Sequence, residues 1–303
     1  MKHSTFLMSL VAVLIANPLL HSQQTQVLPT EKYSVLPAPN VYLWPQGAPL
    51  ATGNTDADKP HLTLYLPKLQ RSKTGILLCP GGGYGGLSTT LEGTEIALWL
   101  NAMGIPAFVL QYRIRPYRHP VESLDAARAM RWVRAHADEL HIAPDRIGIF
   151  GGSAGGHLAS TISTHFDAGD PKAADPIDRV SDRPDFAILL YPVIDPIGPA
   201  SQSTFNNLLG KSPDTELVEE YSNDKRVTSQ TPPTFLALAD DDTKVWPESS
   251  IRYYQALHAA GVSVEMHIYQ RGGHGFGSAW EDPVPGQWRQ SLITWLQFRG
   301  LLF

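Results

Sequence analysis

The sequence predicts an α/β protein with a mostly parallel central sheet covered by helices on both faces. Short apolar runs of strand length alternate along the chain with longer stretches that have the spacing of amphipathic helices. Several of these runs are continuously apolar, which is typical of strands buried on both faces of a parallel sheet. Hydrophobic residues make up 43% and charged residues 17% of the 303-residue chain, a globular balance that one large domain accommodates.

The local patterns predict seven strands, five helices and one long insertion. Residues 195–231 interrupt the alternation, are rich in proline, serine and asparagine, and contain only a weak helical patch at 216–221. This insertion is too long for a turn, so we expect either a surface excursion or a small lid or pocket wall. We expect strands at residues 61–66, 75–79, 107–112, 147–150, 186–191, 234–239 and 262–268, and helices at residues 92–103, 121–140, 154–164, 249–260 and 287–302.

The N-terminus has the pattern of a targeting segment. A short polar head is followed by an apolar stretch at residues 6–15, which is too short to span a bilayer comfortably. We therefore expect a signal peptide at residues 1–22, a secreted or periplasmic mature protein, and no stable membrane anchor after cleavage. Residues 23–60 then form an extended lead-in, and residues 61–303 form the main domain.

Charge and cysteine content exclude several classes. The net charge is −5 and no lysine- or arginine-rich run occurs, which argues against nucleic-acid binding. Cys79 is the single cysteine, so the chain can form neither an internal disulfide nor a thiolate zinc site. No histidine–carboxylate cluster has metal-ligand spacing. We expect neither a metal nor a cofactor.

The strongest local signal is the run Gly151-Gly152-Ser153-Ala154-Gly155, which fits the pattern G-x-S-x-G. An apolar strand leads into it and a helix-forming stretch follows, the arrangement that presents a nucleophilic serine at the end of a sheet. The turn is sharp, so the flanking residues must be small. The helix N-terminus also favours the negative charge that develops there. We therefore expect Ser153 to be a catalytic nucleophile rather than part of a chance glycine-rich turn.

A serine nucleophile needs a base, and the base needs a carboxylate to orient it. In strand–turn–helix hydrolases these groups follow in the order serine, acid, histidine. His274 lies between glycines in a loop near the C-terminus, which suits an imidazole that must face substrate. Residues 240–242 are three consecutive aspartates after a predicted strand, and one of them suffices as the acid. Asp195, after the strand at 186–191, is the main alternative.

Attack on an acyl carbon places negative charge on its oxygen, which backbone N–H groups must stabilise. The glycine-rich run at residues 80–86 follows a predicted strand, and glycines allow the backbone to approach a ligand closely. We expect the amides of Gly82, Gly83 and Ala154 to form this oxyanion hole. A phosphate-binding loop is disfavoured, because no Lys-Ser or Lys-Thr follows these glycines.

These segments together resemble the α/β-hydrolase superfamily, specifically its esterase/lipase-like group with acetyl-xylan-esterase-like (BD-FAE-like) members. The resemblance implies an α/β-hydrolase catalytic domain over residues 61–303 and places the acid at Asp242. Pro80 stands where relatives often have a histidine, a departure that bears on substrate preference and leaves the triad intact. The resemblance covers most of residues 41–300 and includes the segments 43–49, 80–84, 153–159, 231–236, 267–269 and 273–277.

The sequence also suggests roles for three further residues. His157 matches a family histidine in the helix after the nucleophile, and the resemblance implies a structural role beneath the turn. Thr89 and Glu92 have the spacing of a helix capping box. A role for Glu92 in lining the acyl pocket is the alternative.

The resemblance implies a secreted serine carboxylic-ester hydrolase. It would remove acetyl or other short acyl groups from xylan-like carbohydrate esters through an acyl-enzyme intermediate, so its partner is a small-molecule or polysaccharide ester. Three alternatives remain: a peptidase resembling the prolyl-oligopeptidase catalytic domain, a short-chain lipase, and a binding module without catalysis. The sequence does not predict the oligomeric state.

Overall fold

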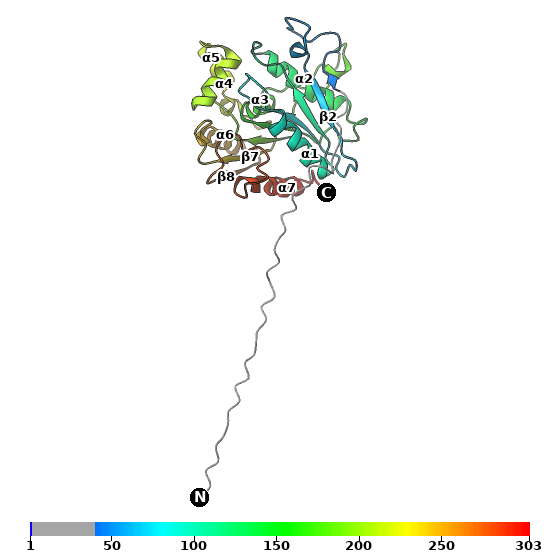
Figure 1. Ribbon diagram of the computed structural model, residues 1–303. Coiled ribbons are helices and arrows are strands. Elements are labelled where there is room, and N and C mark those ends of the chain that lie inside the picture. Colours follow the sequence, from blue (N-terminus) through cyan, green and yellow to red (C-terminus); the bar gives the residue numbers. More distant parts are fainter. Residues whose placement is uncertain (2–39) are drawn as a thin grey trace. The chain divides into compact units, whose positions relative to one another are not determined.

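The computed structural model describes Met1 and residues 40–303 (Figure 1). The predicted signal peptide and residues 23–39 of the lead-in lie outside the described residues, apart from Met1 itself. The eight strands form one sheet in the order β1-β2-β4-β3-β5-β6-β7-β8. β2 is antiparallel to both β1 and β4, and all other neighbours are parallel. The predicted α/β class with a mostly parallel sheet is confirmed.

The central strands match their predicted positions closely. Every residue of β3, β5, β6 and β7 is buried, which explains their continuous apolar character. The two-residue strand β1 was not predicted. The strands are β1 (Val41–Tyr42), β2 (His61–Tyr65), β3 (Gly75–Cys79), β4 (Ala107–Gln111), β5 (Ile147–Gly152), β6 (Phe186–Leu190), β7 (Thr234–Ala239) and β8 (Val264–Tyr269).

The helices are α1 (Glu95–Ala102), α2 (Val121–Ala135), α3 (Ser153–Thr164), α4 (Pro199–Leu209), α5 (Thr215–Glu220), α6 (Pro247–Ala259) and α7 (Trp288–Phe298). A π-helical turn, η2 (Thr90–Thr94), precedes α1. The predicted insertion holds two helices, α4 and α5. Only α5 corresponds to the predicted helical patch.

Two apolar layers enclose the sheet. Side chains of α2, α3 and α6 pack on one face, and side chains of α1 and α7 pack on the other. Figure 1 shows α1 and α7 together on the lower side of the sheet and α2 and α3 on the upper side. Trp99 of α1 and Trp288 of α7 meet edge to face, with ring centroids 5.2 Å apart. Cys79 is fully buried at the end of β3, as the packing role predicts.

A buried ion pair fixes the start of the described chain to the sheet. Arg113, just after β4, bonds Asp125 of α2, with Nη2 2.6 Å from Oδ1, and both side chains are at most 1% exposed. The same guanidinium donates to the carbonyl of Pro49 and lies over the ring of Trp44. Three segments that are distant in sequence therefore meet at one charge pair.

Asp125→Asn should lower the free energy of unfolding by about 3–5 kcal/mol, because it leaves the Arg113 charge buried without a counter-charge. Urea unfolding of the purified variant measures this loss. Asp178→Asn is the matched control, since Asp178 pairs with Arg128 from a half-exposed position. That change should cost no more than about 1 kcal/mol. Equal losses in the two variants would contradict the role of the buried pair.

Candidate active site

Ser153 lies on the turn between β5 and α3, with a left-handed backbone φ of +52°. The neighbouring glycines make this turn possible. A Cβ on Gly155 would lie 1.9 Å from the carbonyl oxygen of Cys79, and a Cβ on Gly151 would lie 2.1 Å from that of Gly155. A side chain at Gly155 would therefore separate the first turn of α3 from the end of β3, and one at Gly151 would separate it from the end of β5.

The structure brings the three predicted triad residues together. Ser153 Oγ lies 2.8 Å from His274 Nε2, and His274 Nδ1 lies 2.7 Å from Asp242 Oδ2. The His274 side chain is 14% exposed and that of Asp242 is 1% exposed, so the carboxylate is shielded while the imidazole keeps access to solvent. This is the nucleophile–base–orienting-acid geometry of serine hydrolases.

The other candidate carboxylates lie in different surroundings. Asp241 is exposed and accepts a hydrogen bond from the amide of Gly273, and Asp240 is exposed. Asp195 is buried, but its Oδ1 accepts from Ser249 Oγ. Of these four aspartates only Asp242 bonds His274, and its second oxygen accepts the amide N–H groups of Lys244 and Val245. The loop backbone thus fixes the orienting carboxylate.

The glycine-rich segment runs directly beside the serine. A Cβ on Gly81 would lie 3.0 Å from Cβ of Ser153. Gly82 (φ +129°) and Gly83 (φ +63°) adopt conformations that favour glycine. Within residues 40–303, neither of their N–H groups donates a hydrogen bond. Ala154 lies in the first turn of α3, where amides lack intrahelical acceptors. These three amide N–H groups can therefore donate hydrogen bonds to an oxyanion.

The insertion contacts this glycine segment, which the sequence did not reveal. Asn207 of α4 donates from Nδ2 to the carbonyl of Gly83 at 2.8 Å. Farther along, the Asn223 amide donates to Ser160 Oγ of α3 at 2.7 Å. The insertion is therefore packed on the core and forms a wall next to the predicted oxyanion hole.

His157 is fully buried beneath the turn and has a structural role, as the resemblance implied. Its Nε2 lies 2.9 Å from the carbonyl of Tyr221, so this nitrogen carries the proton and Nδ1 accepts from the Tyr84 hydroxyl at 2.8 Å. Burial lowers the pKa of the imidazole to about 4. The ring therefore stays neutral at neutral pH and supports Tyr84 of the glycine segment.

The capping-box prediction for Thr89 and Glu92 is wrong. Thr89 makes no side-chain cap bond. The Glu92 carboxylate instead accepts from the Gly81 amide at 2.6 Å and from the Tyr191 hydroxyl at 2.9 Å. Long-range contacts thus replace the local bond that the spacing suggested.

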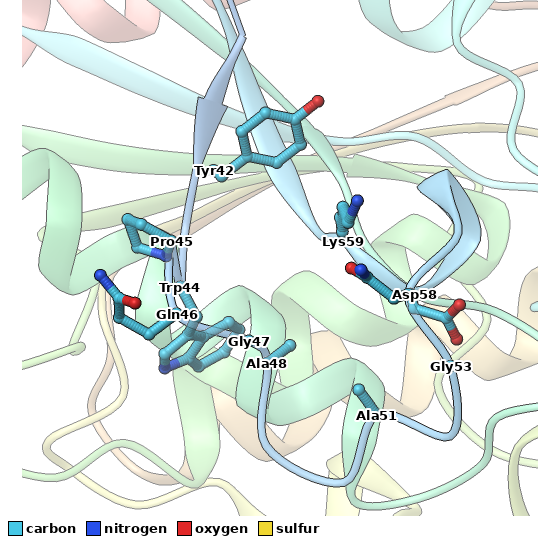
Figure 2. Close-up of a pocket in the computed structure, with 11 residues that line it drawn as sticks. Tyr42, Trp44, Pro45, Gln46, Gly47, Ala48, Ala51, Gly53, Asp58 and Lys59 are labelled. Atoms are coloured by element: carbon cyan, nitrogen blue, oxygen red, sulfur yellow. The ribbon is translucent and has the colours of Figure 1, made fainter.

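A separate hollow of about 650 Å³ is lined by residues between 42 and 59 (Figure 2). Figure 2 shows Tyr42 and Lys59 on opposite sides of it. Because His61 of β2 pairs antiparallel with Gln111 of β4, the residues before β2 lie at the sheet edge where β4 ends. That is also the edge that carries the triad, although no triad residue lines this hollow.

In the part of the chain that the structure describes, no group of three or more His, Cys, Asp or Glu residues could hold a metal ion. Among the same residues, no helix is long and apolar enough to cross a bilayer.

Comparison with known proteins identifies the family. Residues 76–278 match the model of a family with the α/β-hydrolase fold. The chain belongs to this α/β-hydrolase family. The acetyl ester-xyloside bifunctional hydrolase from Caldicellulosiruptor lactoaceticus has a similar crystal structure, with a TM-score of 0.83 and 40% identity. That match covers 89% of this chain and 100% of the other.

Two relatives are named for xylan chemistry. The hydrolase is 36% identical over 248 residues to an acetylxylan esterase of Xylanibacter ruminicola, a match over 80% of this chain and 49% of that protein. It is 32% identical over 225 residues to endo-1,4-beta-xylanase B of Butyrivibrio fibrisolvens, a match over 71% of this chain and 34% of that protein. The chain therefore spans about half of the first relative's length and a third of the second's.

Asp242→Asn should lower turnover of an acetyl ester by about 10⁴-fold, because His274 loses the carboxylate that sets its tautomer and orientation. Asp240→Asn, Asp241→Asn and Asp195→Asn should each change turnover by about tenfold or less. Initial rates of the four purified variants on one substrate decide the assignment. An inactive but folded Asp195→Asn variant would move the acid to the earlier strand.

Proposed function

We infer that this α/β-hydrolase is a serine carboxylic-ester hydrolase with Ser153, His274 and Asp242 as its triad. The observation that carries this inference is the continuous hydrogen-bonded chain from Ser153 Oγ to His274 and on to Asp242, at 2.8 and 2.7 Å. A serine hydroxyl at the start of a helix, with a base in contact and an oriented acid behind it, is equipped for acyl transfer.

The reaction follows from these positions. Ser153 Oγ attacks the acyl carbon while His274 Nε2 takes the hydroxyl proton, and the acyl oxygen becomes an oxyanion facing the amides of Gly82, Gly83 and Ala154. Collapse of this intermediate breaks the ester C–O bond, and His274 returns its proton to the departing alcohol. A water molecule then attacks the acyl-enzyme with His274 again as base. The bond between the acyl carbon and Ser153 Oγ breaks, His274 returns the proton to Oγ, and the carboxylic acid is released.

The substrate class we propose is a carbohydrate ester that carries acetyl or other short acyl groups. Support comes from the similarity to an acetylxylan esterase and to an acetyl ester-xyloside hydrolase. The wall formed by α4 beside the glycine segment gives the site a boundary that a sugar or acyl group would contact. We also propose a secreted or periplasmic location, on the apolar segment at residues 6–15 and the external location of plant polysaccharide.

Ser153→Ala should lower turnover of p-nitrophenyl acetate by about four to six orders of magnitude. A fluorophosphonate should label the wild type covalently and leave the variant unlabelled, because the nucleophilic oxygen is gone. Circular dichroism and the thermal midpoint verify that the variant is folded. A labelled Ser153→Ala protein would mean that the nucleophile lies elsewhere.

A substrate panel tests the carbohydrate-ester proposal. Acetate release from acetylated xylan and hydrolysis of p-nitrophenyl acetate should both greatly exceed hydrolysis of p-nitrophenyl octanoate. Ser153→Ala serves as the blank for each substrate. Preference for octanoate would favour a lipase, and cleavage of aminoacyl-arylamides without acetyl-ester hydrolysis would favour a peptidase. Labelling by a fluorophosphonate without turnover of any of these substrates would contradict the proposed substrate class alone.

A further inference from the structure

Glu92 is a buried carboxylate for which the triad mechanism gives no role. Its side chain lies in η2 and the residue is 4% exposed. Among the described residues it forms no ion pair, yet Oε2 accepts the Gly81 N–H at 2.6 Å and Oε1 accepts the Tyr191 O–H at 2.9 Å. Burying a carboxylate without a cation costs free energy. The hydrogen bonds from Gly81 and Tyr191 therefore stabilise a carboxylate whose burial is otherwise unfavourable.

The carboxylate fills the space between the glycine segment and the nucleophile turn. A Cβ on Gly152 would lie 2.8 Å from Cδ of Glu92, and a Cβ on Gly81 would lie 2.5 Å from its Oε2. Both backbones therefore press directly on this one side chain. A side chain at the position before Ser153 would therefore require the Glu92 carboxylate to shift.

Tyr191 extends the contact to the histidine loop. It follows β6 with a left-handed φ of +35°, a conformation that the surrounding contacts must hold for a residue with a large side chain. Its hydroxyl accepts the N–H of Gly277 at 3.0 Å while donating to Glu92. Its ring also meets that of His274 edge to face, with centroids 5.2 Å apart.

We propose that Glu92 and Tyr191 are positioning residues. They hold the glycine segment and the histidine loop at fixed positions relative to each other, on either side of Ser153. The link runs from the Gly81 amide through Glu92 and Tyr191 to the Gly277 amide, four consecutive groups joined by three hydrogen bonds. Gly81 directly precedes the two glycines whose amides face the oxyanion. This inference rests on the proposed function.

The ionised form of Glu92 suits this role. The pKa of its carboxyl is raised, because burial outweighs the lowering effect of the bonds from Gly81 and Tyr191 and of the nearby His274. Both oxygens already accept a hydrogen bond, so the anion satisfies both donors without a further proton. The titratable groups that face it are Tyr191, Tyr112 and His274. A negative charge here also stabilises the imidazolium that His274 becomes during the reaction.

Glu92→Gln tests the link, because glutamine offers one acceptor oxygen to two donors. We expect kcat on p-nitrophenyl acetate to fall by about 10- to 100-fold with KM changed by less than about threefold, as for a group that acts only in the transition state. The second-order rate of fluorophosphonate labelling should fall in parallel. That rate depends on the serine, histidine and oxyanion groups and needs no knowledge of the natural ester.

Tyr191→Phe is the second variant, since it removes the hydroxyl and keeps the ring against His274. Its loss should resemble that of Glu92→Gln, and the double variant should be no more impaired than the worse single variant, because both break the same link. Glu122→Gln is the matched control. Glu122 is fully buried in α2 and bonds none of these loops, and burial raises its pKa to about 8. Its substitution should leave kcat and labelling unchanged.

Three results would overturn the positioning role. These are unchanged kcat and labelling in both variants, a rise in KM alone, and fully additive losses in the double variant. Rates are normalised to folded protein by near-ultraviolet circular dichroism, and Tyr191→Phe decides the matter if Glu92→Gln does not fold. A wild type that is labelled but hydrolyses no ester would refute the proposed function, while the labelling rates would still test the link.

Discussion

The contact between the first turn of α3 and the end of β3 is the constraint on which the rest of the site depends. There is no room for a Cβ at Gly155, because the carbonyl of Cys79 lies where it would project. The helix can therefore begin directly above the sheet edge, with its amides and Ser153 pointing out of that edge. The glycine segment after β3 then starts beside the nucleophile, and the loops after β7 and β8 need only reach the same place.

The strands were predictable because burial on both faces leaves a direct trace in composition. β3 and β7 begin and end where their apolar runs do. Helix α4 gave no such trace, since its sequence begins with proline and is rich in serine, threonine and asparagine. It is stabilised by burying Thr204, Phe205 and Leu208 against the core, and tertiary packing of this kind is invisible in a local window.

The site residues also differ in how far the sequence could predict them. Ser153 and His274 were identified from glycines next to them in sequence, because the local backbone must be free of bulk. Asp242 needed the family resemblance, since nothing local separates it from Asp240 and Asp241. Glu92 was misassigned, because a spacing that fits a local cap cannot reveal that the carboxylate points instead to Gly81 and Tyr191. The role of a residue whose partners lie far along the chain can be assigned only when the fold is known.

The left-handed backbone of Ser153 has an evolutionary consequence. An L-residue in this region costs about 1–2 kcal/mol that a glycine would not incur. A glycine at this position would therefore make the protein more stable, but catalysis requires the serine hydroxyl. A descendant freed from selection for activity could relax the turn with a single substitution. Such a protein would keep the fold and lose the chemistry, so a glycine at this position would mark a relative that no longer hydrolyses esters.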